Sequence, residues 1–299
     1  MRTLLISLTV ALGMGCGAET ELGTQQLAGR YLNGRYLNGI YLNGQTLDGS
    51  SVRSFTLDGS QLVAHRSNGR EVRDLTGTTL SATGSDGVAL KLRVNGISRH
   101  PTMSDVYLYD LSIQDGTAWQ PLCVDTDGVD GPAIALAGAW DAREGVPGGG
   151  SYSNPSGAIT LACRGYALAK CVELLGYRPW AGNGPQHRSC VRVLRADYCG
   201  DGRSWTENGN PVNVYDSVGI QSDAALWLPE AEWTEDGARC LTKERYTQLD
   251  LLNQQGLLGV GGLPACLLAK VSLTCGVLGW QLRAKLVSEV PLTLSIDVL

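Results

Sequence analysis

The sequence predicts an α+β fold: a disulfide-rich domain of antiparallel strands with two or more short helices, preceded by a short β-solenoid-like five-residue repeat. Three observations lead to this prediction. The chain of 299 residues carries nine cysteines, several segments alternate apolar and polar residues, and an apolar residue recurs every five positions near the N-terminus. A chain of this length can bury a large core.

The N-terminus has the features of an export signal. Arg2 supplies a positive charge, residues 4–12 form an apolar run, and the small residues of Gly13-Met14-Gly15 precede Cys16. The run is too short to span a bilayer as a helix. This pattern resembles the lipobox of bacterial lipoproteins, except that Gly13 stands where a leucine is usual.

The lipobox resemblance implies that residues 1–15 are a lipoprotein signal peptide and that Cys16 carries lipid. Residues 16–21 would then be a tether to the membrane. Gly17 after the cysteine is similar to lipoproteins sorted to the outer membrane, with the protein facing the periplasm or the cell surface. An ordinary secretory signal is the alternative.

Residues 22–62 repeat with a period of five that fits neither a helix nor a strand. The period suits a square coil with Asn-Gly or Asp-Gly corners, similar to pentapeptide-repeat β-solenoids. In that family, however, Asn or Asp precedes the central leucine, whereas here it follows. A flexible spacer is the alternative. The phased apolar residues are Leu22, Leu27, Leu32, Leu37, Leu42, Leu47, Val52, Leu57 and Leu62.

Residues 63–299 are predicted to form the disulfide-rich domain, and its first part is strand-like. Val88 to Val94 alternates, and so does Asp105 to Ile113, whose more apolar face carries Tyr107, Tyr109, Leu111 and Ile113. We expect these two segments to be neighbouring antiparallel strands. Asp125 to Gly131 lacks the glycine and glutamate positions of an EF-hand, so a solvated turn is the default and an irregular calcium loop the alternative. Gly145 to Gly150 is predicted to be a flexible loop.

Two helices are expected next. Ala162 to Gly176 places apolar residues on one face and ends at a glycine, and a second helix spans Ser189 to Gly200. On one continuous helix Cys190 and Cys199 would lie on opposite faces, so each should pair elsewhere. A Cys171–Cys190 bond would join the two helices.

The last part of the chain is predicted to form hairpins and buried apolar segments. Trp205 to Asp216 should turn at Asn208-Gly209, and Ala231 to Tyr246 at Asp236-Gly237, which places Cys240 in a strand. The apolar tail from Leu257 contains a proline and several glycines, which favours buried helix and strand over a membrane span.

With Cys16 lipidated, eight cysteines remain to form a disulfide framework. No C-x-x-C occurs and the three histidines lie far apart in sequence, so we expect no metal site and no cofactor. The net charge of -5 argues against nucleic-acid binding. The remaining cysteines are Cys123, Cys163, Cys171, Cys190, Cys199, Cys240, Cys266 and Cys275.

The segment from His187 to Gln221 concentrates the residues that could carry chemistry. An acid and a base could be drawn from His187, Asp197, Asp201, Glu207 and Asp216. A structural role for the aspartates, through capping or ion pairs, is the competing interpretation. In that case Asp197 and Asp201 would pair with Arg192, Arg195 or Arg203.

The same segment resembles a known family. Ala196-Asp197-Tyr198-Cys199 matches the signature of the ADYC domain, found mainly in myxobacterial secreted proteins and lipoproteins. Lys170 to Trp180, Val214-Tyr215-Asp216 and Gly219-Ile220-Gln221 are also similar to that family, and the resemblance covers roughly residues 85–280. It implies an exported location but no mechanism.

Two functions are therefore expected, from different classes. The first is an envelope-anchored lipoprotein that serves as a disulfide-stabilised binding or structural module, with the membrane as one partner and an envelope protein or a glycan as ligand. The alternative is a periplasmic or extracellular hydrolase that uses the acidic cluster around Asp197. Neither G-x-S-x-G nor H-E-x-x-H occurs in the chain, which favours the first.

Overall fold

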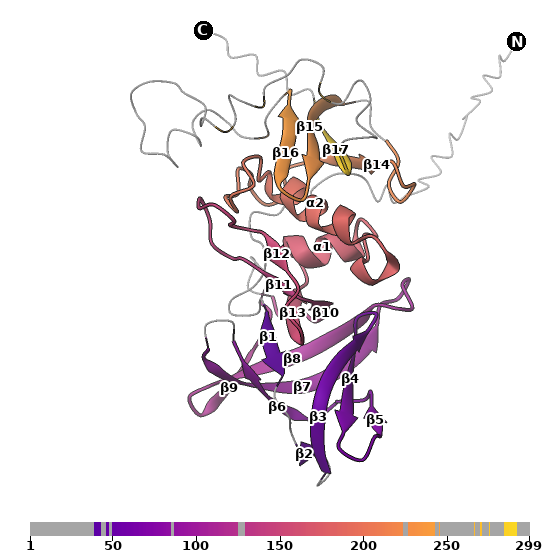
Figure 1. Cartoon of the computed structure of the whole chain (residues 1–299), viewed down its shortest axis with the longest axis vertical. Helices are drawn as coiled ribbons and strands as arrows, with labels where there is room; N and C mark the ends of the chain where they lie inside the picture. Colours follow the sequence, from indigo (N-terminus) through magenta and orange to yellow (C-terminus); the bar gives the residue numbers. More distant parts are fainter. Residues whose placement is uncertain are drawn as a thin grey trace, which may run out of the picture.

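The computed structural model describes residues 39–42, 46–47, 50–84, 87–124, 129–223, 227–242, 245, 266, 270, 275 and 284–291. Its elements lie in three parts along the longest axis, with strands β1–β9 at one end, two helices in the middle and a smaller sheet at the other end (Figure 1). Cys16, the predicted signal peptide and most of the repeat lie outside the described residues. Within the described ranges, no helix is long and apolar enough to cross a membrane.

Six antiparallel strands form a sheet that closes on itself, because β8 pairs with β10 as well as with β7. The strand order is β10-β13-β1-β6-β7-β8, and β9 continues the sheet beyond β8. The predicted pairing of the segments around Val94 and Leu111 is confirmed, and Tyr109 and Leu111 lie in the interior. The strands are β1 (Ile40–Leu42), β6 (Thr79–Thr83), β7 (Ala89–Arg99), β8 (Tyr107–Asp115), β9 (Ala118–Pro121), β10 (Ala133–Ala137) and β13 (Ala158–Cys163).

A second antiparallel sheet, β2-β3-β4-β5, packs onto the same interior core through side chains such as Phe55 and Leu62. Where the repeat is described, its residues form ordinary strands: β1 belongs to the closed sheet, and β3 and β4 form a hairpin that turns at Gly59-Ser60. The boundary predicted at residue 63 falls inside this hairpin. The strands are β2 (Thr46–Leu47), β3 (Ser50–Asp58), β4 (Gln61–Arg66) and β5 (Glu71–Val72).

Strands β10 and β13 separate two hydrophobic cores. Ala135 and Leu161 point into the core of the closed sheet, whereas Ile134 and Ala162 point into a second core that contains the helices. Every residue of β13 is buried for this reason. A strand buried on both faces loses the polar–apolar alternation by which strands are recognised in sequence.

The helices begin elsewhere than predicted. Helix α1 spans Ala167–Glu173, because residues 162–163 belong to β13, and α2 spans Gly184–Arg195 after the short 3-10 helix η1 (Pro179–Ala181). Pro185 in the first turn of α2 suits a helix start, since the missing N–H would have no partner there. The helix ends before Cys199, so the opposite-face argument for Cys190 and Cys199 rested on a wrong boundary.

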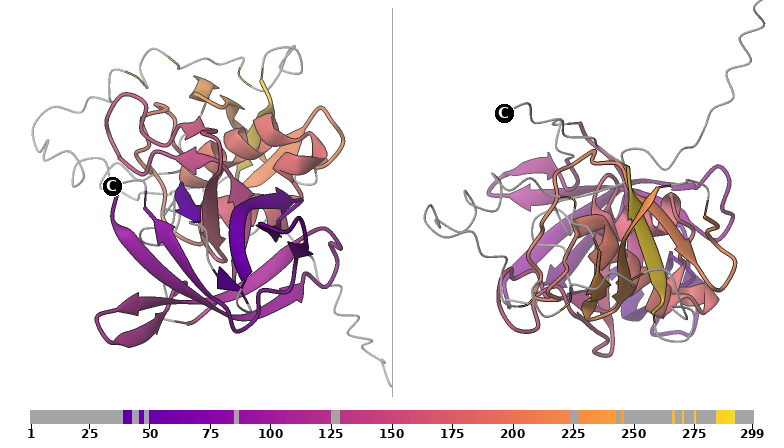
Figure 2. Two further views of the ribbon diagram at one scale, coloured as in Figure 1. Left: turned by 60° about the horizontal axis from the view of Figure 1, so that its bottom comes forward. Right: turned by 90° about the horizontal axis from the view of Figure 1, so that it is seen from above.

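The third part is the sheet β14-β17-β15-β16, which packs over α2 (Figure 2, right). The hairpin predicted at Asp236-Gly237 is confirmed as β15 (Leu228–Thr234) and β16 (Gly237–Leu241). The hairpin predicted at Asn208-Gly209 is wrong, because β14 (Asn213–Asp216) pairs with β17 (Leu286–Val290). A separate pair, β11 (Ala139–Trp140) and β12 (Tyr152–Ser153), flanks the helices.

The predicted disulfide framework is confirmed, because the eight cysteines after Cys16 form four disulfides. One bond lies in the closed sheet, one joins α1 to α2, and two tie the last part of the chain to the Cys199 turn and to β16. The bond between the helices is the one expected from sequence. The pairs are Cys123–Cys163, Cys171–Cys190, Cys199–Cys266 and Cys240–Cys275.

Candidate functional site

The segment Ala196–Cys199 leaves α2 through a sharp turn. Ala196 has φ 51, and among the described residues it is the only non-glycine residue with a positive φ. The Ala196 N–H donates to the carbonyl of Val193 over 3.0 Å, and the Asp197 N–H to that of Arg192 over 2.9 Å. This left-handed C-cap satisfies carbonyls at the helix end. It also directs the next three side chains into different parts of the interior.

Asp197 is fully buried and its carboxylate is surrounded by donors. Oδ1 accepts hydrogen bonds from the N–H of Gly200 (2.9 Å) and Asp201 (3.1 Å), and Oδ2 accepts one from the N–H of Gly202 (2.9 Å). Arg192, itself 3% exposed, forms an ion pair with Oδ2. Burial raises the pKa of Asp197, and the guanidinium of Arg192 acts against that shift. The predicted structural pairing of Asp197 with Arg192 is confirmed.

A glycine-rich loop closes over the turn that Asp197 organises. The Val146 N–H donates to the carbonyl of Asp201 over 3.3 Å, and Arg192 Nη1 donates to the carbonyl of Gly149 over 2.8 Å. A Cβ on Gly149 would lie 2.1 Å from the carbonyl oxygen of Asp201, so only glycine allows the two backbones to approach this closely. The glycine run that predicted a flexible loop is therefore a packing surface, which corrects that expectation.

Tyr198 stacks on Trp233 with ring centroids 5.2 Å apart, and its hydroxyl enters a second buried polar network. The hydroxyl donates to Glu230 Oε1 over 2.6 Å and accepts a bond from the N–H of Arg245 over 2.9 Å. Glu230 also pairs with Arg245 Nε at 2.6 Å and accepts a bond from the Ser288 hydroxyl at 2.5 Å. Burial and the neighbouring Glu230 carboxylate raise the pKa of Tyr198, so the phenol remains a donor.

Cys199 completes the segment by forming its disulfide with Cys266. Lys270 adds a second tie, because its Nζ donates to the carbonyl of Tyr198 over 2.7 Å. Burial lowers the pKa of Lys270. The residues from Ala196 to Cys199 therefore hold different parts of the fold. Ala196 caps the helix end, Asp197 holds the loop of residues 200–202, Tyr198 joins the network at β15 and contacts Lys270, and Cys199 is bonded to Cys266.

Asp216 organises a second loop. Its Oδ1 accepts bonds from the N–H groups of Val218 and Gly219, both at 2.7 Å, and its Oδ2 accepts one from the N–H of Gln221 at 2.7 Å and one from the Tyr177 hydroxyl at 2.9 Å. Asp216 and Asp197 share no partner. Both carboxylates are acceptors for a backbone turn, which is a common structural use of aspartate.

The other acidic candidates do not join Asp197 in a cleft. Asp201 is partly exposed and its Oδ1 accepts a bond from the N–H of Arg203 over 3.0 Å, while Glu207 is exposed. The structure thus does not bring the predicted acids and His187 together around one cavity. Glu230, which sequence reasoning missed, is the buried carboxylate at the centre of a network. The sequence holds no clear signal for it, because Glu230 and Glu232 alternate with Ala231 and Trp233 as on a strand with one solvent-facing side.

His187 is completely buried on α2. Its Nε2 contacts the carbonyl oxygen of Leu168 at 3.0 Å, and its ring meets Trp140 edge-on with centroids 5.7 Å apart. Within the described part of the chain, Nδ1 has no hydrogen-bond partner. Burial lowers the pKa of His187 to about 4. The neutral imidazole is therefore a packed core residue.

The protein should lose stability in mild acid through His187. The pKa of His187 is near 6.5 in the unfolded chain and about 4 in the folded one, so the unfolded state binds the extra proton between these values. The free energy of unfolding should fall by about 3 kcal/mol as the pH drops from 6.5 to 4. Urea unfolding across this range should show that loss in the wild type and not in His187→Gln. An equal loss in both proteins would contradict the assignment.

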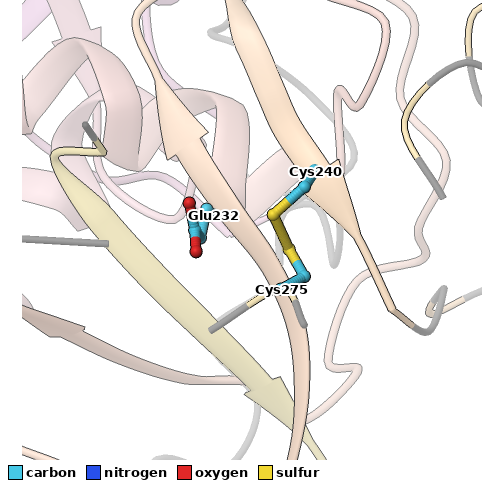
Figure 3. A group of neighbouring side chains, drawn as sticks. All are labelled: Glu232, Cys240 and Cys275. Carbon is cyan, nitrogen blue, oxygen red and sulfur yellow. A yellow bond between two sulfur atoms is a disulfide. The ribbon is translucent and has the colours of Figure 1, made fainter. Parts of the chain in front are cut away.

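A group with metal-ligand character lies at β15 and β16, where Glu232 stands within 4.8 Å of the sulfur atoms of Cys240 and Cys275 (Figure 3). Those sulfurs are bonded to each other. A thiolate is the form of cysteine that binds metal, so this arrangement does not suit an ion. Glu232 pairs with Arg239 at 2.7 Å instead.

Two adjoining grooves open on the outer surface of the strand-rich end. The larger, about 560 Å³, lies over β7 and β8, and the smaller, about 340 Å³, lies beside α1. They meet at the segment Asp130–Pro132. The larger is lined by apolar residues such as Ile97 and Pro121, by uncharged polar residues and by Asp110 and Asp130. The smaller is lined by Arg164, Lys170 and Glu173 among others.

A family model matches more than half of the chain. The model of the ADYC domain matches residues 72–247, which includes the Ala196–Cys199 segment and three of its buried partners, Arg192, Glu230 and Arg245. Neither the curated proteins nor the solved structures contain a match to the chain.

Proposed function

The chain belongs to the ADYC domain family, and from this premise we propose that it is an exported, disulfide-stabilised binding module held at the cell envelope by a lipid on Cys16. The proposal rests on what the carboxylates of the candidate residues bind. The carboxylates of Asp197, Asp216 and Glu230 are saturated by protein donors, as expected for groups that hold loops in place. A general acid or base must instead reach a substrate proton.

The disulfides support the exported location. Four bonds persist in an oxidising compartment and would be reduced in a bacterial cytosol. Residues 1–15 then act as the signal peptide, and outer-membrane sorting follows from Gly17 after the lipidated cysteine. Residues 22–38 of the repeat stand between the anchor and β1 in the sequence.

Intact mass measurement tests the anchor and the framework together. Protein purified from membranes should carry a diacylglycerol mass on Cys16 and take up no alkylating reagent before reduction. After reduction it should take up eight equivalents, one for each remaining cysteine. Thiol labelling before reduction, or an unmodified Cys16 in the membrane fraction, would contradict the proposal.

The matched variant is Cys16→Ser, which removes the acceptor of the lipid and leaves all four disulfides intact. It should leave the membrane fraction and keep the same count of eight thiols after reduction. Loss of the framework in this variant would show that the anchor is needed for folding. Unchanged membrane association would show that something other than the lipid holds the protein.

A further inference from the structure

An irregularity in β7 lies in the lining of the larger groove. Val94 pairs with Leu111 and Gly96 pairs with Asp110, so Asn95 is an extra residue on β7. Bulges of this kind are frequent beside functional sites, and a glycine inside a strand often marks a close approach to a ligand. A Cβ on Gly96 would have no neighbour nearer than the Asp110 Cβ at 4.0 Å, so packing alone does not require glycine here.

The polar groups of this groove are held in fixed positions. Asn95 Nδ2 donates to Asp110 Oδ1 over 3.1 Å and to the Ser112 hydroxyl over 2.8 Å, while Arg93 Nε donates to Asn95 Oδ1 over 3.0 Å. In the described part of the chain, no protein group donates to Asp110 Oδ2 or to the carboxylate of Asp130. Asp110 and Asp130 both line the groove, and their carboxylate oxygens can accept hydrogen bonds from a ligand.

An aromatic side chain continues this network. Trp119 on β9 lies under the Arg93 guanidinium, which is 4.8 Å from its ring centroid. It is two residues from Pro121, which lines the groove, and so shares a face of β9 with it. The half-buried indole thus adds an apolar surface beside the polar groups.

The charges of the groove select among ligands. Its lining includes the carboxylates of Asp110 and Asp130 and no lysine or arginine, so a phosphate or a carboxylate would be repelled. The nearby Arg93 offsets one negative charge, which weakens the attraction for a cation. A neutral ligand rich in hydroxyl groups can donate to the two carboxylates and place a carbon face on apolar lining residues such as Ile97, Pro121 and Pro132.

We propose that the groove over β7–β9 binds a neutral oligosaccharide. The proposal deepens the proposed function and rests on it only for the envelope location. Asp110 and Asp130 accept bonds from sugar hydroxyls, and the bulge at Asn95-Gly96 forms the floor. Pro121 of the lining and Trp119 beside it on β9 provide the apolar contact for the sugar.

The test measures binding to the full-length protein, with its disulfides intact, by isothermal titration. The probes are a tetrasaccharide of glucose, a tetrasaccharide of N-acetylglucosamine and, as a competing class, a short lysine-rich peptide. We expect at least one saccharide to bind. Gly96→Val, which adds a side chain where there is space and in a residue type that favours strands, should weaken that binding at least tenfold.

Trp119→Ala should weaken saccharide binding at least fivefold, whereas Asp115→Asn, an exposed change at the far end of β8, should not alter it. Thermal unfolding of each variant shows that the fold is kept. The proposal is overturned if neither saccharide binds, if only the peptide binds, or if Gly96→Val and Trp119→Ala bind as the wild type does. None of these outcomes bears on the lipid or the disulfide count, so they leave the proposed function separately tested.

Discussion

Replacing Asp197 by asparagine should lower the free energy of unfolding by about 3–5 kcal/mol, because it breaks a buried ion pair from one side. Arg192 stays 3% exposed and loses its counter-ion, and the amide presents N–H groups where a carboxylate accepted bonds from Gly200, Asp201 and Gly202. The loop of residues 200–202 then loses its anchor, together with the glycine loop that rests on it. Urea unfolding followed by tryptophan fluorescence measures the loss.

Asp201→Asn is the matched control. Asp201 belongs to the same loop but is partly exposed, and its Oδ1 accepts a bond from the Arg203 N–H. Its substitution should change the free energy of unfolding by less than about 1 kcal/mol. If the two variants were equally stable, the buried pair would not be the structural centre described above. If the Asp197→Asn protein were as stable as the wild type, a chemical role for this carboxylate would be favoured instead.

Glu230→Gln should have an effect of similar size, about 3–5 kcal/mol, for a related reason. Glu230 is fully buried and holds the Tyr198 hydroxyl, the Arg245 guanidinium and the Ser288 hydroxyl. Glutamine keeps the shape and removes the charge, so Arg245, whose side chain is 2% exposed, loses its counter-ion. Denaturant unfolding of the variant and the wild type at pH 7 gives the difference.

Two further variants test whether the loss of stability comes from the Glu230–Arg245 pair. Glu235→Gln removes a partly exposed partner of Arg188 and should change the free energy of unfolding by at most about 1 kcal/mol. Combining Glu230→Gln with Arg245→Met should recover part of the loss, because the unpaired buried charge is then gone. Additive losses in the double variant would show that Glu230 and Arg245 do not stabilise each other.

The sequence alone predicted the features that depend on local chemistry or on counting. The even number of cysteines after Cys16 predicted a disulfide framework, Asp236-Gly237 predicted a hairpin turn, and alternation over Asp105 to Ile113 predicted a strand. The pairing of Asp197 with a nearby arginine of α2 was also within reach, since the partners are five residues apart. The Ala196–Cys199 signature marked the segment at which several buried interactions meet, but it did not predict the partners in those interactions.

What the tertiary structure decided depends on partners that are far apart in the chain. β13 is buried on both faces and therefore resembled the start of a helix, and β14 pairs with β17 because the strand 70 residues downstream, not the nearby turn, supplies its partner. The structural role of Glu230 depends on its contacts with Tyr198, Arg245 and Ser288, which come from distant parts of the chain. Local residues specify turns and strand faces, whereas burial and ion pairing are properties of the environment that distant segments create when they pack together.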